Sequence, residues 1–256
     1  MNPPGRSFPS SIGKKVVMAV TGFIMYVFVV GHLTGNLQIF QHPDHINGYA
    51  QFLRNLGPLL WIARIGLLAS VVLHVWAATA LALENKRARG DLPQKKRWIR
   101  ASLSSRYIRW TGYLVLVFIL YHLAQFTWGL TNPADFKVGH SYVMQEDYRI
   151  LGFTALKAGT TVDNVYRMVY RSFESVPVSV FYIVAVGLLS LHLLHGLDSL
   201  FQTFGWRSEQ WAGGLRKIVA TLCLLYFLGN LAIAAAIVTG VLPPHPAAQV
   251  HGVTQP

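Results

Sequence analysis

The sequence has few charged residues and only one cysteine, and each shortage excludes a class of protein. Charged residues make up 12% of the 256 positions, against about 25% in a soluble domain, which argues against a water-soluble fold. The single cysteine, Cys223, excludes a disulfide framework and a cysteine metal site. Covalent haem attachment is excluded too, because the chain has no Cys-x-x-Cys-His.

Long apolar runs are what the chain has instead. Hydrophobic residues make up 53% of it, and five runs reach the ~20 helical residues that cross a ~30 Å hydrocarbon core. They lie at about 16–40, 58–83, 110–130, 176–203 and 214–242. The sequence therefore predicts an all-α integral membrane protein, a single domain (1–256) of five transmembrane helices. The one long soluble segment is an outer loop, 131–175, in which 163–175 has the apolar spacing of a helix capping the outer surface.

Basic residues outnumber acidic ones by 22 to 10, and their places in the chain predict its orientation. They gather before the first run, between the second and third, and between the fourth and fifth: Lys14, Lys15, Lys86, Arg87, Arg89, Lys95, Lys96, Arg97, Arg100, Arg106, Arg109, Arg207, Arg216 and Lys217. These three segments lie on one side, so the positive-inside rule predicts a cytoplasmic N-terminus and an external C-terminus. We expect these basic residues to bind membrane lipid and partner proteins, and we expect no binding of nucleic acid.

Four of the ten histidines lie deep inside the first four runs, one in each: His32, His74, His122 and His192. Ionisable groups are costly at that depth and indicate a functional site. One interpretation is that each imidazole makes a hydrogen bond between helices. The other is haem, whose iron takes one axial imidazole on each face, so that four histidines would hold two bis-histidine haems b.

The depth of each histidine follows from the helical rise of ~1.5 Å per residue. Counted from the predicted cytoplasmic ends, His74 lies ~14 Å deep, His122 and His192 both ~18 Å, and His32 ~24 Å. His74 is therefore assigned to an inner haem and His32 to an outer one, while the other two are not separated. Arg64, near the outer leaflet, is a candidate partner for the outer haem's propionates. Glycines that would let a macrocycle approach the backbone, or simply pack helices, accompany the histidines: Gly22, Gly31, Gly35, Gly66, Gly112, Gly129, Gly187 and Gly196.

The chain resembles a known family over about residues 12 to 240. The resemblance is carried by "SIGKKVVMAVTGFIMYVFVVGHLTGNLQIF" (11–40), "NKRARGDLPQKKRWIRASLSSRYIRWTG" (85–112), "YHLAQF" (121–126) and "HLLHGLDSLFQTFG" (192–205). The family is the five-helix, di-haem cytochrome b subunit of succinate:quinone oxidoreductases, the succinate dehydrogenase/fumarate reductase b558 type.

The resemblance implies a subunit of the bacterial cytoplasmic membrane that anchors a flavoprotein subunit and an iron–sulfur subunit on the cytoplasmic face. Electrons from succinate oxidation would then pass through the inner and the outer haem to a quinone. In this family the first and third helices hold the outer haem, which gives His32 with His122. The second and fourth hold the inner one, which gives His74 with His192.

The fourth run contains two histidines, and the resemblance selects between them. In the family a glycine follows the ligand after four residues and another follows nine residues later. Gly196 and Gly205 stand at these places relative to His192. His195 is therefore expected near the haem edge, where it would donate or accept a hydrogen bond. Ser190 stands where some members carry a glutamate implicated in proton transfer, so that pathway is in doubt.

The quinone site and the function class each keep an alternative. Asp44, the only acidic residue of the first outer loop "HPDHINGY" (42–49), is a candidate for quinone proton chemistry; a solvated loop charge is the favoured alternative. A cytochrome b of a formate dehydrogenase, hydrogenase or b561 type is a runner-up. A transporter that uses buried histidines as a proton relay is the alternative from another class. The type of quinone, the direction of the reaction and the oligomeric state of the complex are left open.

Overall fold

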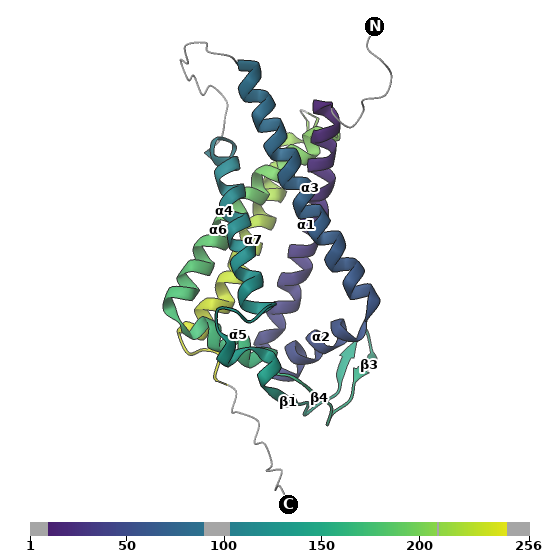
Figure 1. Cartoon of the computed structure of the whole chain (residues 1–256), viewed down its shortest axis with the longest axis vertical. Coiled ribbons are helices and arrows are strands. Elements are labelled where there is room, and N and C mark those ends of the chain that lie inside the picture. The colour runs from purple at the N-terminus through teal and green to yellow at the C-terminus, as the bar shows by residue number, and fades with distance from the viewer. Residues whose placement is uncertain (1–9, 90–102, 209, 245–256) are drawn as a thin grey trace, which may run out of the picture. The chain divides into compact units, whose positions relative to one another are not determined.

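The computed structural model describes residues 10–89, 103–208 and 210–244, and helices dominate it (Figure 1). The helices are α1 (Ser11–Asn36), α2 (Pro43–Asn55), α3 (Pro58–Arg89), α4 (Leu103–Phe126), α5 (Val165–Glu174), α6 (Val176–Thr203) and α7 (Ala212–Val238). Three short 3₁₀ turns accompany them, η1 (Leu37–Phe40), η2 (Pro133–Asp135) and η3 (Lys137–Gly139).

Four of the described helices are long and apolar enough to cross a membrane: α1 continued by η1, α3, α6 and α7. Their solvent-accessible faces are themselves apolar. On α3, for example, Leu59, Ile62, Ile65 and Leu68 are all more than half exposed and recur at every third position. Such a stripe is unfavourable in water and suits a hydrocarbon environment. The protein is therefore membrane-embedded, as predicted.

The helix α4 is the fifth predicted span. Its 24 residues correspond to about 36 Å of helix, which exceeds the hydrocarbon thickness. It is not among the four helices whose length and composition both meet the requirement within the described residues. The fifth span and the orientation of the termini therefore stay predictions.

Hydropathy located the helices better than it located their ends. The predicted range 176–203 is the observed range of α6, whereas α1 begins at Ser11 rather than 16 and α3 continues to Arg89 rather than ending at 83. A backbone that has started a helix continues its hydrogen bonding into polar residues such as Lys86 and Arg87. The apolar pattern reports only the part of a helix that prefers hydrocarbon.

The prediction of an all-α protein is wrong for the outer segment 131–175, which contains four short strands. They are β1 (Ser141–Val143), β2 (Tyr148–Ile150), β3 (Phe153–Leu156) and β4 (Thr161–Asp163), and they pair antiparallel as β1 with β4 and β2 with β3. Strands of three or four residues are too short for an alternating pattern to be recognised. The predicted helix within 163–175 is confirmed as α5, capped by Asn164, whose side chain accepts a hydrogen bond from the backbone N–H of Arg167 at 2.9 Å.

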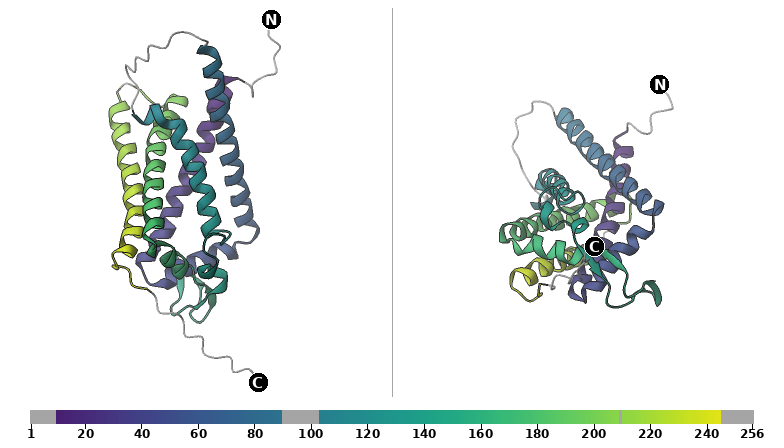
Figure 2. Two further views of the ribbon diagram at one scale, coloured as in Figure 1. Left: turned by 60° about the vertical axis from the view of Figure 1, so that its left-hand side comes forward. Right: turned by 60° about the horizontal axis from the view of Figure 1, so that its bottom comes forward.

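The first outer loop, 42–49, is also not a loop, because residues from Pro43 onward form α2. Pro43 occupies the first turn, where its missing N–H costs nothing, and the His42 side chain accepts from the Asp44 N–H at 3.4 Å. Helix α2 packs against α5 and against β2, β3 and β4 (Figure 2). Its buried residues include Ile46 and Asn47. Helix α2, the four strands and α5 together form a compact cap, which we call the outer cap after the side of the membrane that the sequence predicts for it.

The chain divides into two compact units, and the division cuts each of the five long helices. The first unit comprises Met1–Gly31, Trp61–Val115 and Gly187–Phe227, and the second comprises His32–Leu60, Leu116–Val186 and Leu228–Pro256. His74, His192 and His195 belong to the first unit. His32, His122 and the outer cap belong to the second. Each pair of histidines that the family resemblance implies therefore falls within one unit.

Candidate functional site

In the first unit, His74 of α3 faces His192 of α6. Their ring centroids are 6.3 Å apart and the ring planes make an angle of 66°. His195 lies one helical turn beyond His192 and beside Asp198, whose carboxylate accepts from Nη1 of Arg207 at 3.3 Å. The histidine of α6 that the structure brings to His74 is thus His192.

In the second unit, His32 of α1 faces His122 of α4. The ring centroids are 5.7 Å apart and the planes are nearly perpendicular, at 89°. Aromatic rings border His122, with Phe126 at 5.4 Å, Phe118 at 5.9 Å and Tyr182 at 6.1 Å between centroids. These aromatic side chains border the imidazole and offer flat surfaces to a planar ligand.

Both separations fit two imidazoles that bind one iron. An imidazole nitrogen binds a metal ion at about 2 Å, and the ring centre lies about 1 Å behind that nitrogen, so two axial imidazoles have ring centres about 6 Å apart. Within the described residues no group of three or more His, Cys, Asp or Glu side chains could hold a metal ion. Haem needs only two protein ligands, because the macrocycle supplies the others.

The hydrogen bonds of His74 determine where its proton lies. Its Nδ1 is 3.0 Å from the carbonyl oxygen of Met18 and 3.3 Å from Oγ1 of Thr21, both on α1. A carbonyl oxygen can only accept, so Nδ1 carries the hydrogen. In the neutral ring the lone pair then belongs to Nε2, which is the nitrogen a metal ion would use.

A similar arrangement serves His122 in the second unit. Its Nδ1 is 3.5 Å from the hydroxyl of Tyr182, and that hydroxyl donates its own hydrogen to Oε1 of Gln125 at 2.7 Å. The Tyr182 oxygen is therefore left as an acceptor toward His122. Both Tyr182 and Gln125 are buried. Neither residue was predicted from the sequence.

Two glycines allow the first pair to lie against neighbouring helices. A Cβ added at Gly22 of α1 would be 3.2 Å from Cε1 of His74, and one added at Gly112 of α4 would be 3.2 Å from Cε1 of His192. Both distances are tighter than ordinary van der Waals contact. These two glycines were predicted to let a macrocycle approach the helix backbone. In the structure the group that approaches the backbone at both positions is a histidine ring.

The structure shows Asp44 buried, so the expected solvated loop charge is wrong. Its side chain is in the first turn of α2, and the residue is only 3% exposed. One carboxylate oxygen accepts the Glu146 N–H at 2.8 Å, both oxygens are 3.1 Å from the Gln145 nitrogen, and Nδ1 of His42 is also at 3.1 Å. These bonds join α2 to the segment between β1 and β2. The predicted part of Asp44 in quinone chemistry stays a prediction.

Arg64, the candidate partner of the haem propionates, and the basic clusters have different surroundings. Arg64 is exposed, and its guanidinium lies over the ring of Trp61, 5.1 Å from the centroid. Lys14 is buried and forms an ion pair with Glu84 of α3. Four basic residues of the connection between the second and third runs lie outside the described residues: Lys95, Lys96, Arg97 and Arg100. The side chains of Arg89 and Arg106 lie outside them too.

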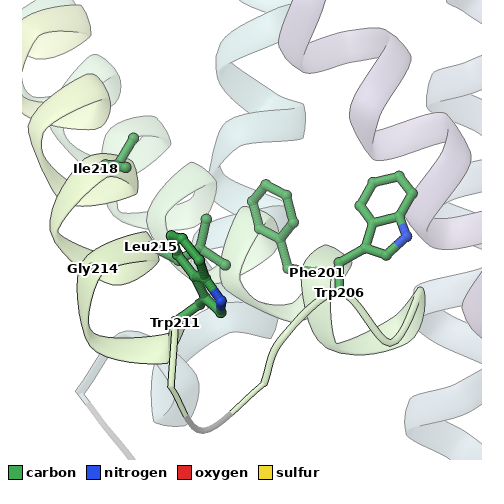
Figure 3. Close-up of a pocket in the computed structure, with 6 residues that line it drawn as sticks. All are labelled: Phe201, Trp206, Trp211, Gly214, Leu215 and Ile218. Atoms are coloured by element: carbon green, nitrogen blue, oxygen red, sulfur yellow. The ribbon is translucent and has the colours of Figure 1, made fainter.

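An apolar groove is present in the first unit where α6 turns into α7. It has a volume of about 320 Å³ and is lined by Phe201, Trp206, Trp211, Gly214, Leu215 and Ile218. Phe201 and Leu215 lie between the two tryptophans (Figure 3). None of the lining side chains can ligate iron or exchange a proton at neutral pH, and none of the four paired histidines lines the groove.

Comparison of the chain with models of known protein families, with curated proteins and with solved structures found no match.

Proposed function

We propose that the chain is the di-haem b membrane-anchor subunit of a succinate:quinone oxidoreductase, passing electrons from an iron–sulfur subunit to membrane quinone. The observation that carries the proposal is the pairing of four helix-borne histidines in two units, with ring centroids 5.7 Å and 6.3 Å apart. Haem iron held between such pairs supplies reversible one-electron transfer. The family resemblance supports the choice of enzyme.

The protein's part in this function is to hold the imidazoles in position, to set their protonation and to keep water out. His32 and His122 would hold the outer haem iron, and His74 and His192 the inner one. The Met18 carbonyl keeps the hydrogen of His74 on Nδ1. Rings such as Phe118 and Phe126 border His122 and keep its surroundings apolar.

We further propose the topology and the partners that the sequence predicts. The helix α4 is the fifth span, the N-terminus is in the cytoplasm and the C-terminus is outside a bacterial cytoplasmic membrane. The flavoprotein and iron–sulfur subunits bind the cytoplasmic face, where the basic residues gather. The grouping of the start of α1 with the end of α3 supports this topology, since Lys14 pairs with Glu84 and Oγ of Ser11 donates to Glu84 at 3.2 Å.

A spectrum of the purified full-length protein tests the proposal. After expression in bacterial membranes, reduced-minus-oxidised spectra and haem extraction should give two b-type haems per chain. His32→Ala and His122→Ala should each remove the same haem, and His74→Ala and His192→Ala should each remove the other. The matched control is His195→Ala, one turn from His192 on the same helix, which should keep both.

Other outcomes identify the alternatives. A well-folded chain that takes up no haem would refute the proposal and favour the transporter, in which buried histidines relay protons. Loss of a haem in His195→Ala together with retention in His192→Ala would exchange the ligand of α6. Two haems with no succinate-dependent reduction in the assembled complex would favour another quinone-linked dehydrogenase.

A further inference from the structure

The two paired histidines of the first unit, His74 and His192, each contact the same dipeptide on a different helix. Thr21-Gly22 of α1 lies against His74, and Thr111-Gly112 of α4 lies against His192. In both cases the glycine lets the ring approach and the threonine hydroxyl reaches Nδ1, at 3.3 Å for His74 and 3.4 Å for His192. The two contacts are built alike although they belong to helices far apart in the chain.

The hydrogen of each threonine hydroxyl is already committed. Oγ1 of Thr21 donates to the carbonyl of Val17 at 2.7 Å, and Oγ1 of Thr111 donates to the carbonyl of Ile108 at 3.0 Å. A hydroxyl has one hydrogen and two lone pairs, so each oxygen can only accept toward the histidine. Both threonines are buried, at 5% and 8% exposure, so water does not compete for these lone pairs.

Each threonine acts together with a carbonyl three residues earlier on its own helix. The Met18 carbonyl accepts from His74 at 3.0 Å, and the Ile108 carbonyl, which accepts from Thr111, lies near the His192 ring. Among the described residues, two acceptors therefore face Nδ1 of His74 and the Thr111 oxygen faces Nδ1 of His192. This environment favours the tautomer with hydrogen on Nδ1 and the lone pair on Nε2.

We propose that Thr21 and Thr111 are positioning residues that fix the tautomer and orientation of His74 and His192, and thereby tune the iron these rings hold. This proposal rests on the proposed function. A hydrogen bond from Nδ1–H to an acceptor increases the basicity of Nε2, which stabilises ferric over ferrous iron. Loss of the hydroxyl should therefore raise the midpoint potential of the haem held by His74 and His192.

The first test compares Thr21→Val and Thr111→Val with Thr21→Ser and Thr111→Ser in redox titrations of the purified full-length protein. The valine variants should raise the midpoint potential of one haem and leave the other unchanged, and the serine variants should behave as wild type. If ferric haem loses affinity tenfold more than ferrous haem, the rise is about 59 mV.

Thr203→Val is the matched control. Oγ1 of Thr203 also donates to a carbonyl of its own helix, that of Ser199 at 2.9 Å, and it makes no described contact with a histidine. Loss of that hydroxyl should leave both potentials unchanged. If Thr21→Val and Thr111→Val behave like Thr203→Val, the threonines only satisfy their own helices and the proposal is wrong.

A second measurement needs no threonine variant and no haem. Nitrogen-15 NMR of histidine-labelled, full-length wild-type protein isolated without haem should show hydrogen on Nδ1 and none on Nε2 for His74 and His192. The signals are assigned by their loss in His74→Gln and His192→Gln. Hydrogen on Nε2 of either ring would overturn the proposal. If the wild type binds no haem, the function fails while the tautomers are still measured, so the two failures are distinguishable.

Discussion

Replacing Asp44 by asparagine should loosen the outer cap without disturbing the histidine pairs. The Asp44 carboxylate accepts from two backbone N–H groups, those of Gln145 and Glu146, which lie more than a hundred residues away in the chain. Asparagine keeps the shape of the side chain but has one acceptor oxygen instead of two, and no charge. An amide oxygen in the place of Oδ2 would still accept from both N–H groups, but as a neutral oxygen. The NH2 group in the place of Oδ1 would lie against the Gln145 N–H, so that one buried donor would face another.

The size of the effect follows from the burial of the site. A hydrogen bond to a charged group contributes about 1.5–3 kcal/mol, and a buried donor left without an acceptor costs about 1–3 kcal/mol. With Asp44 only 3% exposed, we expect local opening of the segment around 145–146 to become easier by about 2–4 kcal/mol. At about 1.4 kcal/mol per factor of ten, this is on the order of a 100-fold increase in the open population.

Amide hydrogen exchange measures this population directly, since exchange of the Gln145 and Glu146 amides reports local opening. The matched control is Asp147→Asn in the same segment. Asp147 also accepts a backbone hydrogen bond, from Ala158 at 3.0 Å, but its side chain is 37% exposed. Water can replace that bond, so we expect less than a tenfold change there.

The two roles considered for Asp44 predict different results. If Asp44 serves the cap, Asp44→Asn speeds exchange at 145–146 while haem content is retained. If exchange is unchanged and only quinone reduction is lost, the structural reasoning is refuted and the carboxylate acts in proton transfer. Loss of both would show that the cap shapes the quinone site.

Two further predictions concern the glycines and alkaline pH. Gly22→Ala and Gly112→Ala should each displace a histidine ring by a few tenths of an ångström and weaken the binding of one haem about tenfold in a haem titration. Gly213→Ala is the control and should not weaken binding, because nothing lies within 4 Å of the added Cβ. Equal binding in all three variants would refute the close approach. Burial, and then the neighbouring Asp44, raise the pKa of Tyr142 above its ordinary value of 10.0, so its stabilisation of the cap is fully present below pH 10 and is lost as pH rises through the folded-state pKa. Alkaline titration of cap proteolysis should show this loss in the wild type and a smaller one in Tyr142→Phe, and identical profiles would contradict it.

The long helices and the histidines within them could be predicted from the sequence because both depend only on residues that are close together in the chain. Burial in hydrocarbon demands ~20 consecutive apolar residues whatever the neighbours are, so the run 176–203 predicts α6 without any knowledge of packing. An imidazole inside such a run is conspicuous for the same reason. The threonines also belong to a local pattern, since the dipeptide Thr-Gly begins eleven residues before His32 on α1 and eleven residues before His122 on α4.

The tertiary structure decided which side chains contact one another and which hydrogen bonds each of them makes. Nothing local distinguishes His192 from His195 except a family resemblance, whereas the fold places the His192 ring 6.3 Å from that of His74. The contacts of the cap could not be predicted from the sequence either. Asp44 was expected to be a solvated charge because its hydrogen-bond partners at 145–146 are remote in the chain. The length of an apolar run is a property of one segment of the chain. A hydrogen bond needs two groups close together in space, and when these are remote in the chain only folding brings them together.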